Sequence, residues 1–195
     1  MRVFLTVLIL IFSLQSWTKA DDIREFEIEG MSVKDSLLNY FSKKKILKNK
    51  QKNQFPKSDK FIILTFFDED FLKVYDSVSI VYENNKKYII HSIEGRIFFE
   101  KDIEGCLKKM KEISDEIKNS LENVEKIEGN RNHRYDTSGK SKYIYTAFEF
   151  KSKDYIQVSC TDWSIEMENN KSFADELKVS IATEKFGNFL DNEAY

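Results

Sequence analysis

One long amphipathic helix, predicted between two groups of strand-like segments, most constrains how this chain can fold. Apolar residues recur every three or four positions from Ile103 to Val124, which marks one face of a helix about six turns long. Such a stripe must be buried against another element, and the flanking segments alternate apolar and polar residues as sheet strands do. The sequence therefore predicts an α+β fold in which a long helix, residues 103–126, packs on an antiparallel sheet.

The strand-like segments fall before and after that helix. A turn at Asn84-Asn85 joins two of them into a predicted hairpin over residues 77–99, because Asn tolerates left-handed backbone conformations. The six predicted strands are residues 61–67, 77–82, 87–99, 143–150, 155–161 and 176–183. The remaining expectations are a short strand over 23–28, short helices over 33–42 and 43–50, and a long polar loop over 128–141.

The element order suggests two similar halves. Residues 21–101 would form a helix with a three-stranded sheet, and residues 102–195 would form the long helix with a second three-stranded sheet. Each half has a matching triplet at the start of its helical part, Ile28-Glu29-Gly30 and Ile103-Glu104-Gly105. This match suggests an internal duplication. Two alternatives stay open: a chance similarity, and one continuous domain.

The first twenty residues have the layout of a secretory signal peptide. Met1-Arg2 gives a basic start, residues 3–14 are almost wholly apolar, and Thr18 and Ala20 are the small residues expected before a cleavage site. The apolar run is shorter than the roughly twenty residues that span a bilayer. We expect cleavage after Ala20 and a periplasmic or secreted protein with no transmembrane anchor. The alternative is an uncleaved N-terminal anchor.

The charge balance argues against a nucleic-acid partner. The chain has 31 Lys and Arg against 33 Asp and Glu, and loss of Arg2 and Lys19 with the leader would leave a formal charge near −4. A nucleic-acid-binding protein usually presents a strongly basic surface. The candidate partners that remain are another envelope protein or a small ligand. The sequence does not determine the oligomeric state.

The two cysteines predict one disulfide. Cys106 falls on the apolar stripe of the long helix, and Cys160 shares the apolar face of a strand with Ile156 and Val158. Both sulfur atoms would therefore point into one core, and an exported protein folds in an oxidising compartment. The alternative is two buried free thiols.

One polar loop contains the candidate binding residues. Only five of the 31 basic residues are Arg, and two of them, Arg131 and Arg134, flank His133 and precede Asp136. Such a cluster could bind an anion or a carboxylate ligand. Arg96 is a third scarce arginine, within a predicted strand. A plain solvated loop is the alternative interpretation of residues 131–136.

The sequence carries no recognisable catalytic signature. Its two His do not have metal-ligand spacing, the two Cys are too far apart for a zinc ribbon, and no cofactor motif is present. We therefore expect no metal, no cofactor and a non-catalytic binding or protein-interaction module of the cell envelope. The alternatives are a carrier of a small ligand or lipid in an apolar cavity and, ranked below it, a carboxylate-dependent hydrolase.

Two resemblances accompany these expectations. A resemblance to uncharacterised exported proteins of marine alphaproteobacteria is carried by residues 25–38, residues 88–99 and the helix around Cys106. It covers most of the mature chain and implies export, but it implies no activity. Gly30-Met31-Ser32 and the element order resemble the BamE-like envelope lipoproteins, in which such a turn opens a helical pair followed by a three-stranded sheet. The lipobox Cys of those lipoproteins is missing here, so a lipid anchor does not carry over.

Overall fold

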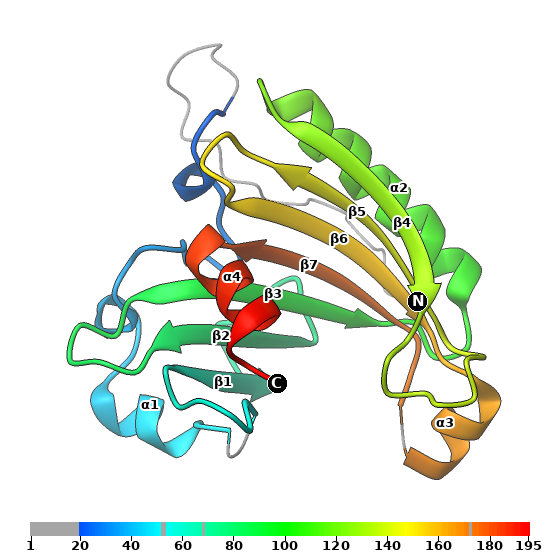
Figure 1. Ribbon diagram of the computed structural model, residues 1–195, viewed down its shortest axis with the longest axis horizontal. Coiled ribbons are helices and arrows are strands. Elements are labelled where there is room, and N and C mark those ends of the chain that lie inside the picture. Colours follow the sequence, from blue (N-terminus) through cyan, green and yellow to red (C-terminus); the bar gives the residue numbers. More distant parts are fainter. Residues whose placement is uncertain (1–19, 52–53, 68, 172) are drawn as a thin grey trace.

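A single antiparallel sheet forms the centre of the protein. The computed structural model describes residues 20–51, 54–67, 69–171 and 173–195, and its seven strands have the spatial order β1-β2-β3-β7-β6-β5-β4 (Figure 1). The strands are β1 Phe61–Phe67, β2 Ser77–Glu83, β3 Ile90–Phe98, β4 Glu125–Asn132, β5 Lys142–Glu149, β6 Tyr155–Asp162 and β7 Glu176–Ala182. The predicted leader, apart from Ala20, lies outside the described residues.

The helices cover both faces of this sheet. The long helix α2, Ile103–Ser120, packs on β6 and β7, so the predicted α+β class with a helix on the sheet is confirmed. Helix α4, Glu184–Asn192, lies on the opposite face, where Phe186 and Phe189 pack with Phe61 of β1 (Figure 1). The other helices are α1 Lys43–Lys48 and α3 Ile165–Lys171, with 3-10 turns at Ile23–Glu25 and Leu37–Asn39.

Strand register separates an apolar face from a polar face. A row of directly paired, buried side chains on the α2 side consists of Leu64, Ile80, Ile93, Ile181, Ile156 and Phe148. The adjacent row, one residue along each strand, points to the other face and consists of Thr65, Ser79, Glu94, Ser180 and Gln157. A slip of one residue in any strand would exchange these environments, so burial fixes the register.

The predicted cysteine pair is at disulfide distance. Asp102 caps α2 by accepting a hydrogen bond from the amide of Gly105, and Cys106 is buried in the first turn. Cys106 and Cys160 of β6 lie with their Cα atoms 6.1 Å apart and their sulfur atoms bonded. This separation is within the range that a disulfide requires. The pair therefore joins the start of α2 to the centre of the sheet, as the two periodicities predict.

The long helix was predicted to reach residue 126 and to be followed by a loop over residues 128–141. Both predictions are wrong where the two segments meet, because a strand lies there. Helix α2 ends at Ser120, because Leu121 is extended and Asn123 has φ +55°, and β4 begins at Glu125. All but one of the residues of β4 are exposed, since it is an edge strand with a partner on one side only. Its sequence therefore lacks the apolar alternation that identifies a half-buried strand.

Two predictions near the N-terminus are also wrong. Residues 33–42 form only a 3-10 turn, because Lys34 has φ +72° and its amide donates to the carbonyl of Ile90. Val33 and Leu37 are nevertheless fully buried. Residues 23–28 form a 3-10 turn closed by a capping box, not a strand. The helix predicted over 43–50 is present as α1.

The division into two halves is not confirmed. The β1–β3 and β4–β6 groups are both three-stranded meanders, but β7 lies between β3 and β6 and pairs with both. The two matching triplets also differ. Glu29 and Gly30 form a turn with positive φ, whereas Glu104 and Gly105 belong to the first turn of α2. One sheet thus extends through both segments.

The residue before the predicted cleavage site is part of the packed structure. Ala20 is buried, its amide donates to the carbonyl of Ser120, and its carbonyl accepts from the amide of Glu122. Cleavage after Ala20 would remove these two hydrogen bonds. Among the described residues, no helix has both the length and the apolar character that crossing a membrane requires.

Candidate functional site

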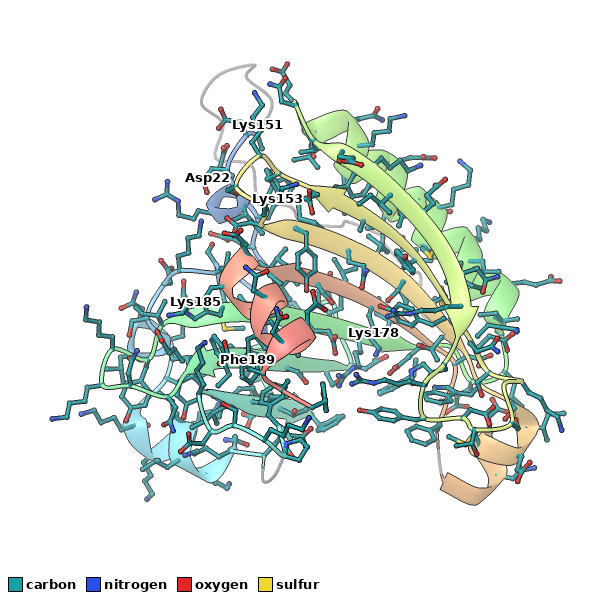
Figure 2. The ribbon with its side chains drawn as sticks, in the orientation of Figure 1. Asp22, Lys151, Lys153, Lys178, Lys185 and Phe189 are labelled. Atoms are coloured by element: carbon teal, nitrogen blue, oxygen red, sulfur yellow. A yellow bond between two sulfur atoms is a disulfide. The ribbon has the colours of Figure 1, made fainter. Side chains whose placement is uncertain are left out.

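A broad groove lies on the face of the sheet opposite α2, and we call it the open-face groove. It has a volume of about 790 Å³. The strands supply its floor, α4 and Phe55 form one side, and the loop between β4 and β5 forms the other. Figure 2 labels Lys178 on β7, in the floor, and Phe189 on α4. A concave site of this size matches the range of ligand-binding pockets.

The floor contains a network of four ion-paired side chains on two adjacent strands. The Arg96 guanidinium on β3 contacts the Glu94 carboxylate, donates to Ser79 Oγ at 3.3 Å, and lies 3.8 Å from Glu176 Oε2. On β7, Lys178 Nζ is 3.1 Å from Glu176 Oε1. These four side chains are about three-quarters buried or more, so the pairs interact more strongly than surface ion pairs.

The network keeps Glu94 and Lys178 charged. Burial alone would raise the pKa of Glu94, but Lys178 and Arg96 hold it below its usual value. Burial would lower the pKa of Lys178, but Glu94 and Glu176 hold it above its usual value. Each charge is therefore stabilised by its neighbours, and the floor presents fixed charges at neutral pH.

Tyrosine side chains line the part of the groove next to this network. The Tyr143 hydroxyl donates to Gln157 Oε1 at 2.6 Å, and burial raises the pKa of Tyr143. Burial also raises the pKa of Tyr155 to about 12. Arg131 of β4 stacks on Tyr143, with its guanidinium carbon 5.1 Å from the Tyr143 ring centroid. Stacking of this kind orients a guanidinium and leaves its N–H groups available to a ligand.

The loop between β4 and β5 meets the last residue of the chain at one end of the groove. Arg134 donates to the Tyr195 hydroxyl at 3.0 Å, and its guanidinium carbon lies 4.6 Å from the Tyr195 ring centroid and 5.0 Å from that of Tyr135. Tyr195 packs edge-on against Phe55 on the α4 side. These contacts connect the two sides of the groove across its end.

His133 occupies the same loop but is held by an aromatic neighbour. Its ring centroid lies 4.2 Å from that of Trp163, and its Nδ1 accepts a hydrogen bond from the Tyr135 amide. Burial, followed by the nearby cations Lys178 and Arg134, lowers the pKa of His133 to about 4. The imidazole is therefore neutral at pH 7, and it contributes an aromatic surface instead of a positive charge.

Asp136, the fourth predicted binding residue, lies outside the groove lining. Its buried carboxylate accepts hydrogen bonds from the amides of Ser138 and Ser141 and from the hydroxyls of Ser141 and Ser164. The hydrogen bonds from Ser138 and Ser141 hold the pKa of Asp136 well below its usual range. The side chain therefore shapes the loop from outside the groove.

The structure brings Arg131, His133 and Arg134 together in one groove with residues that the sequence analysis did not select. Glu94 and Lys178 line the groove, Glu176 pairs with Lys178, and all three lie 37 or more positions from Arg131, His133 and Arg134 in sequence. One signal could have found them: each is a charged residue at the polar position of an alternating strand. Arg96 was noted for its rarity and is the central cation of the network.

Cations outnumber carboxylates in the open-face groove, although the whole chain is slightly acidic. Arg96, Arg131, Arg134 and Lys178 line it, against the single carboxylate of Glu94. Glu176 pairs with Lys178, which leaves Arg131 and Arg134 in excess. The groove therefore attracts anions, and its tyrosine rings offer flat surfaces for stacking.

Comparison of the chain with protein-family models, with curated proteins and with solved structures finds no match in any of the three. Within the described ranges, no group of three or more His, Cys, Asp or Glu side chains is arranged to bind a metal ion. The site is therefore interpreted from its own geometry.

Proposed function

We propose that this protein is an exported, non-catalytic binding module whose open-face groove binds a ligand bearing carboxylate groups. The observation that carries the proposal is the pair of unbalanced arginines, Arg131 and Arg134, held on tyrosine rings at the edge of a polar groove. A guanidinium binds a carboxylate through two parallel N–H···O bonds, and this geometry gives orientation as well as affinity.

The shape of the site favours an extended ligand, such as an acidic peptide segment, over a compact anion. The groove extends across the sheet from β1 to β4, and its tyrosines come from β5, β6, the loop between β4 and β5, and residue 195. Tyrosine supplies a rigid contact surface with a polar tip, which is why it is common in binding surfaces. Export is supported by the pattern of residues 1–20 and by the Cys106–Cys160 pair.

The ionisation of the groove favours binding over hydrolysis. A general acid at neutral pH needs a carboxyl group with a raised pKa. Glu94 has the opposite shift, because Lys178 and Arg96 stabilise its ionised form. Its neighbour Glu176 forms ion pairs with Lys178 and Arg96. A carboxylate-dependent hydrolase is therefore not the function that we propose.

Titration calorimetry with a glutamate-rich peptide of about eight residues tests the proposal. We expect binding that weakens as salt is added, because the interaction is electrostatic. We expect the Arg131→Ala and Arg134→Ala variants each to weaken binding about tenfold, as loss of a charged hydrogen-bonding partner does.

Arg24→Ala is the matched control, because Arg24 is an exposed arginine paired with Asp22 outside the groove. It should leave the affinity unchanged. A lysine-rich peptide of equal length should not bind. Equal binding of both peptides, or an equal loss in the control, would contradict the proposal.

A further inference from the structure

A second pocket lies on the other face of the sheet, and we call it the helix-side pocket. It has a volume of about 380 Å³ and lies between α2 and strands β6 and β7. Its inner surface consists of the branched aliphatic side chains Ile113, Ile117, Ile156, Val179 and Ile181. Protein interiors are normally packed without voids much larger than a water molecule. A space of this size under a core helix is therefore a site for a ligand to occupy.

Two loops form the mouth of this pocket and are joined by one carboxylate. The turn Phe26–Gly30 forms one rim, and residues 71–75 form the other. Glu29 accepts hydrogen bonds from three successive amides across the mouth, those of Lys73, Val74 and Tyr75, at 2.8–3.1 Å. Because its oxygens are occupied in this way, Glu29 holds the rim in place and is a poor partner for a cationic ligand.

Tyr75 gives the pocket its one hydroxyl group. Its ring lies against Gly95 of β3, where an added Cβ atom would lie 2.6–2.7 Å from three ring carbons. Among the described residues, no hydrogen-bond partner of the Tyr75 hydroxyl is present. Burial and the nearby Glu29 carboxylate raise the pKa of Tyr75, so the hydroxyl remains protonated at neutral pH.

We propose that the helix-side pocket binds a single-chain aliphatic molecule with an uncharged hydrogen-bonding head group. The aliphatic floor would take the chain, since each buried methylene contributes about 0.8 kcal/mol. The Tyr75 hydroxyl would bond the head group. The remaining rim charges, Glu27 and Lys73, are of opposite sign and favour no net charge on the ligand. The volume is at the lower end for ligand pockets, so it suits one chain and excludes a two-chain lipid.

Fluorescence of the neutral apolar probe N-phenyl-1-naphthylamine, added to the full chain, tests this proposal. We expect enhancement that decan-1-ol reverses at a lower concentration than decanoate does. Val74→Trp narrows the mouth from the exposed rim, and Val179→Phe fills the floor. Each should weaken probe binding at least tenfold. Tyr75→Phe should weaken decan-1-ol about three- to tenfold and leave the probe unaffected, because only the alcohol needs the hydroxyl.

Ile165→Trp is the control, because it adds the same indole at a residue that is 75% exposed and outside the pocket. Arg131→Ala is a second control, in the open-face groove. Both should bind the probe as the unaltered chain does. Because Val74 lies at the surface, its variant keeps the test decisive if Val179→Phe does not fold, which circular dichroism would show.

Three results would overturn the proposal. One is a probe affinity unchanged by Val74→Trp. Another is a signal lost in Arg131→Ala, which would place the probe in the open-face groove. The third is a concentration-dependent dimer that Val74→Trp abolishes, which would show that a second copy of the chain fills the pocket. None of these results bears on peptide binding by the open-face groove, so the two proposals fail independently.

Discussion

Ser180 and Ile181 are neighbours on β7, yet they lie on opposite faces of the sheet and meet opposite environments. Ile181 is buried against the side of the sheet that α2 covers, whereas Ser180 faces the ion-paired floor of the open-face groove. The strand's alternation alone separates these two surroundings. The comparison teaches that one face of this sheet is organised by burial and the other by charge.

The largest difference in stability between the two faces should come from placing the same polar side chain at both positions. Ile181→Asn creates a buried amide and a cavity, so we expect a loss of about 4 kcal/mol in the free energy of unfolding. Ser180→Asn should cost less than about 1 kcal/mol, because the groove solvates the amide. Urea denaturation of both variants measures the difference. Similar losses would show that the two faces are not distinct.

Removal of the disulfide tests how firmly α2 covers the apolar face. The double variant Cys106→Ala/Cys160→Ala should lose about 2–4 kcal/mol, because the unfolded chain regains the freedom of a long loop. Ser114→Ala is the control, since the buried Ser114 hydroxyl on α2 has no hydrogen-bond partner among the described residues. Thermal melting with and without a reductant checks the effect. A melting temperature that reductant leaves unchanged would contradict the predicted bond.

Two glycines that lie under tyrosine rings give a matched test of the two faces. An added Cβ would meet Tyr75 at Gly95 on the α2 side and Tyr145 at Gly129 on the open face, both closer than 3 Å. We expect Gly95→Ala to cost about 2–3 kcal/mol, because Tyr75 is enclosed by the core. Gly129→Ala should cost less than about 1 kcal/mol, because Tyr145 lies beside the edge strand. Urea unfolding of both variants would show the order, and a reversed order would sink this explanation.

A pH titration distinguishes the faces by their ionisable groups. The pKa of His133 is lowered from 6.5 to about 4 on folding, so the unfolded chain binds a proton first as the pH falls. The contribution of His133 to the free energy of unfolding is therefore complete above pH 6.5 and is lost as the pH falls towards 4. After allowance for solvent screening, we expect a loss of about 1 kcal/mol between pH 7 and pH 5. His133→Asn should reduce that slope and leave the part from other groups, among them His91, whose pKa burial also lowers.

The smallest effect is expected at the edge of the groove. Arg131→Ala should change the free energy of unfolding by no more than about 0.5 kcal/mol, because the residue is exposed and makes no ion pair among the described residues. His133→Ala should cost about 1 kcal/mol, because the imidazole ring packs against Trp163. Equal melting temperatures for the two variants would show that this contact contributes nothing.

The sequence predicted the elements that carry a clear period. Six of the seven strands, the start of α2 and the Cys106–Cys160 pair followed from apolar spacing, because burial on one face imposes that spacing. Edge strand β4 did not follow, since it buries too little to leave a pattern. Helix α4 was not predicted either, although Thr183 accepts the Phe186 amide as its cap and Phe186 and Phe189 are buried.

The candidate site was predicted only in part, for a related reason. The loop residues were found because they are adjacent in sequence. Arg96 pairs with Glu176 in the open-face groove, and Glu29 accepts hydrogen bonds from residues 73–75 at the helix-side pocket. Both contacts join segments that are distant along the chain. No local pattern encodes such a contact. The helix-side pocket is equally hidden, because its lining residues have the same spacing as an ordinary packed core.

The place of β7 in the sheet has a consequence for how the protein reaches its native state. This strand comes last in sequence but lies fourth in the sheet, and it pairs with β3 residues 78 to 90 positions earlier. Before residues 176–182 are available, the two meanders can each form, but β3 and β6 have bare inner edges open to incorrect pairing. Such long-range closure is characteristic of slow folding. We expect the unfolded chain to need protection from aggregation until its last strand arrives, and a chain cut before residue 176 to form no complete sheet.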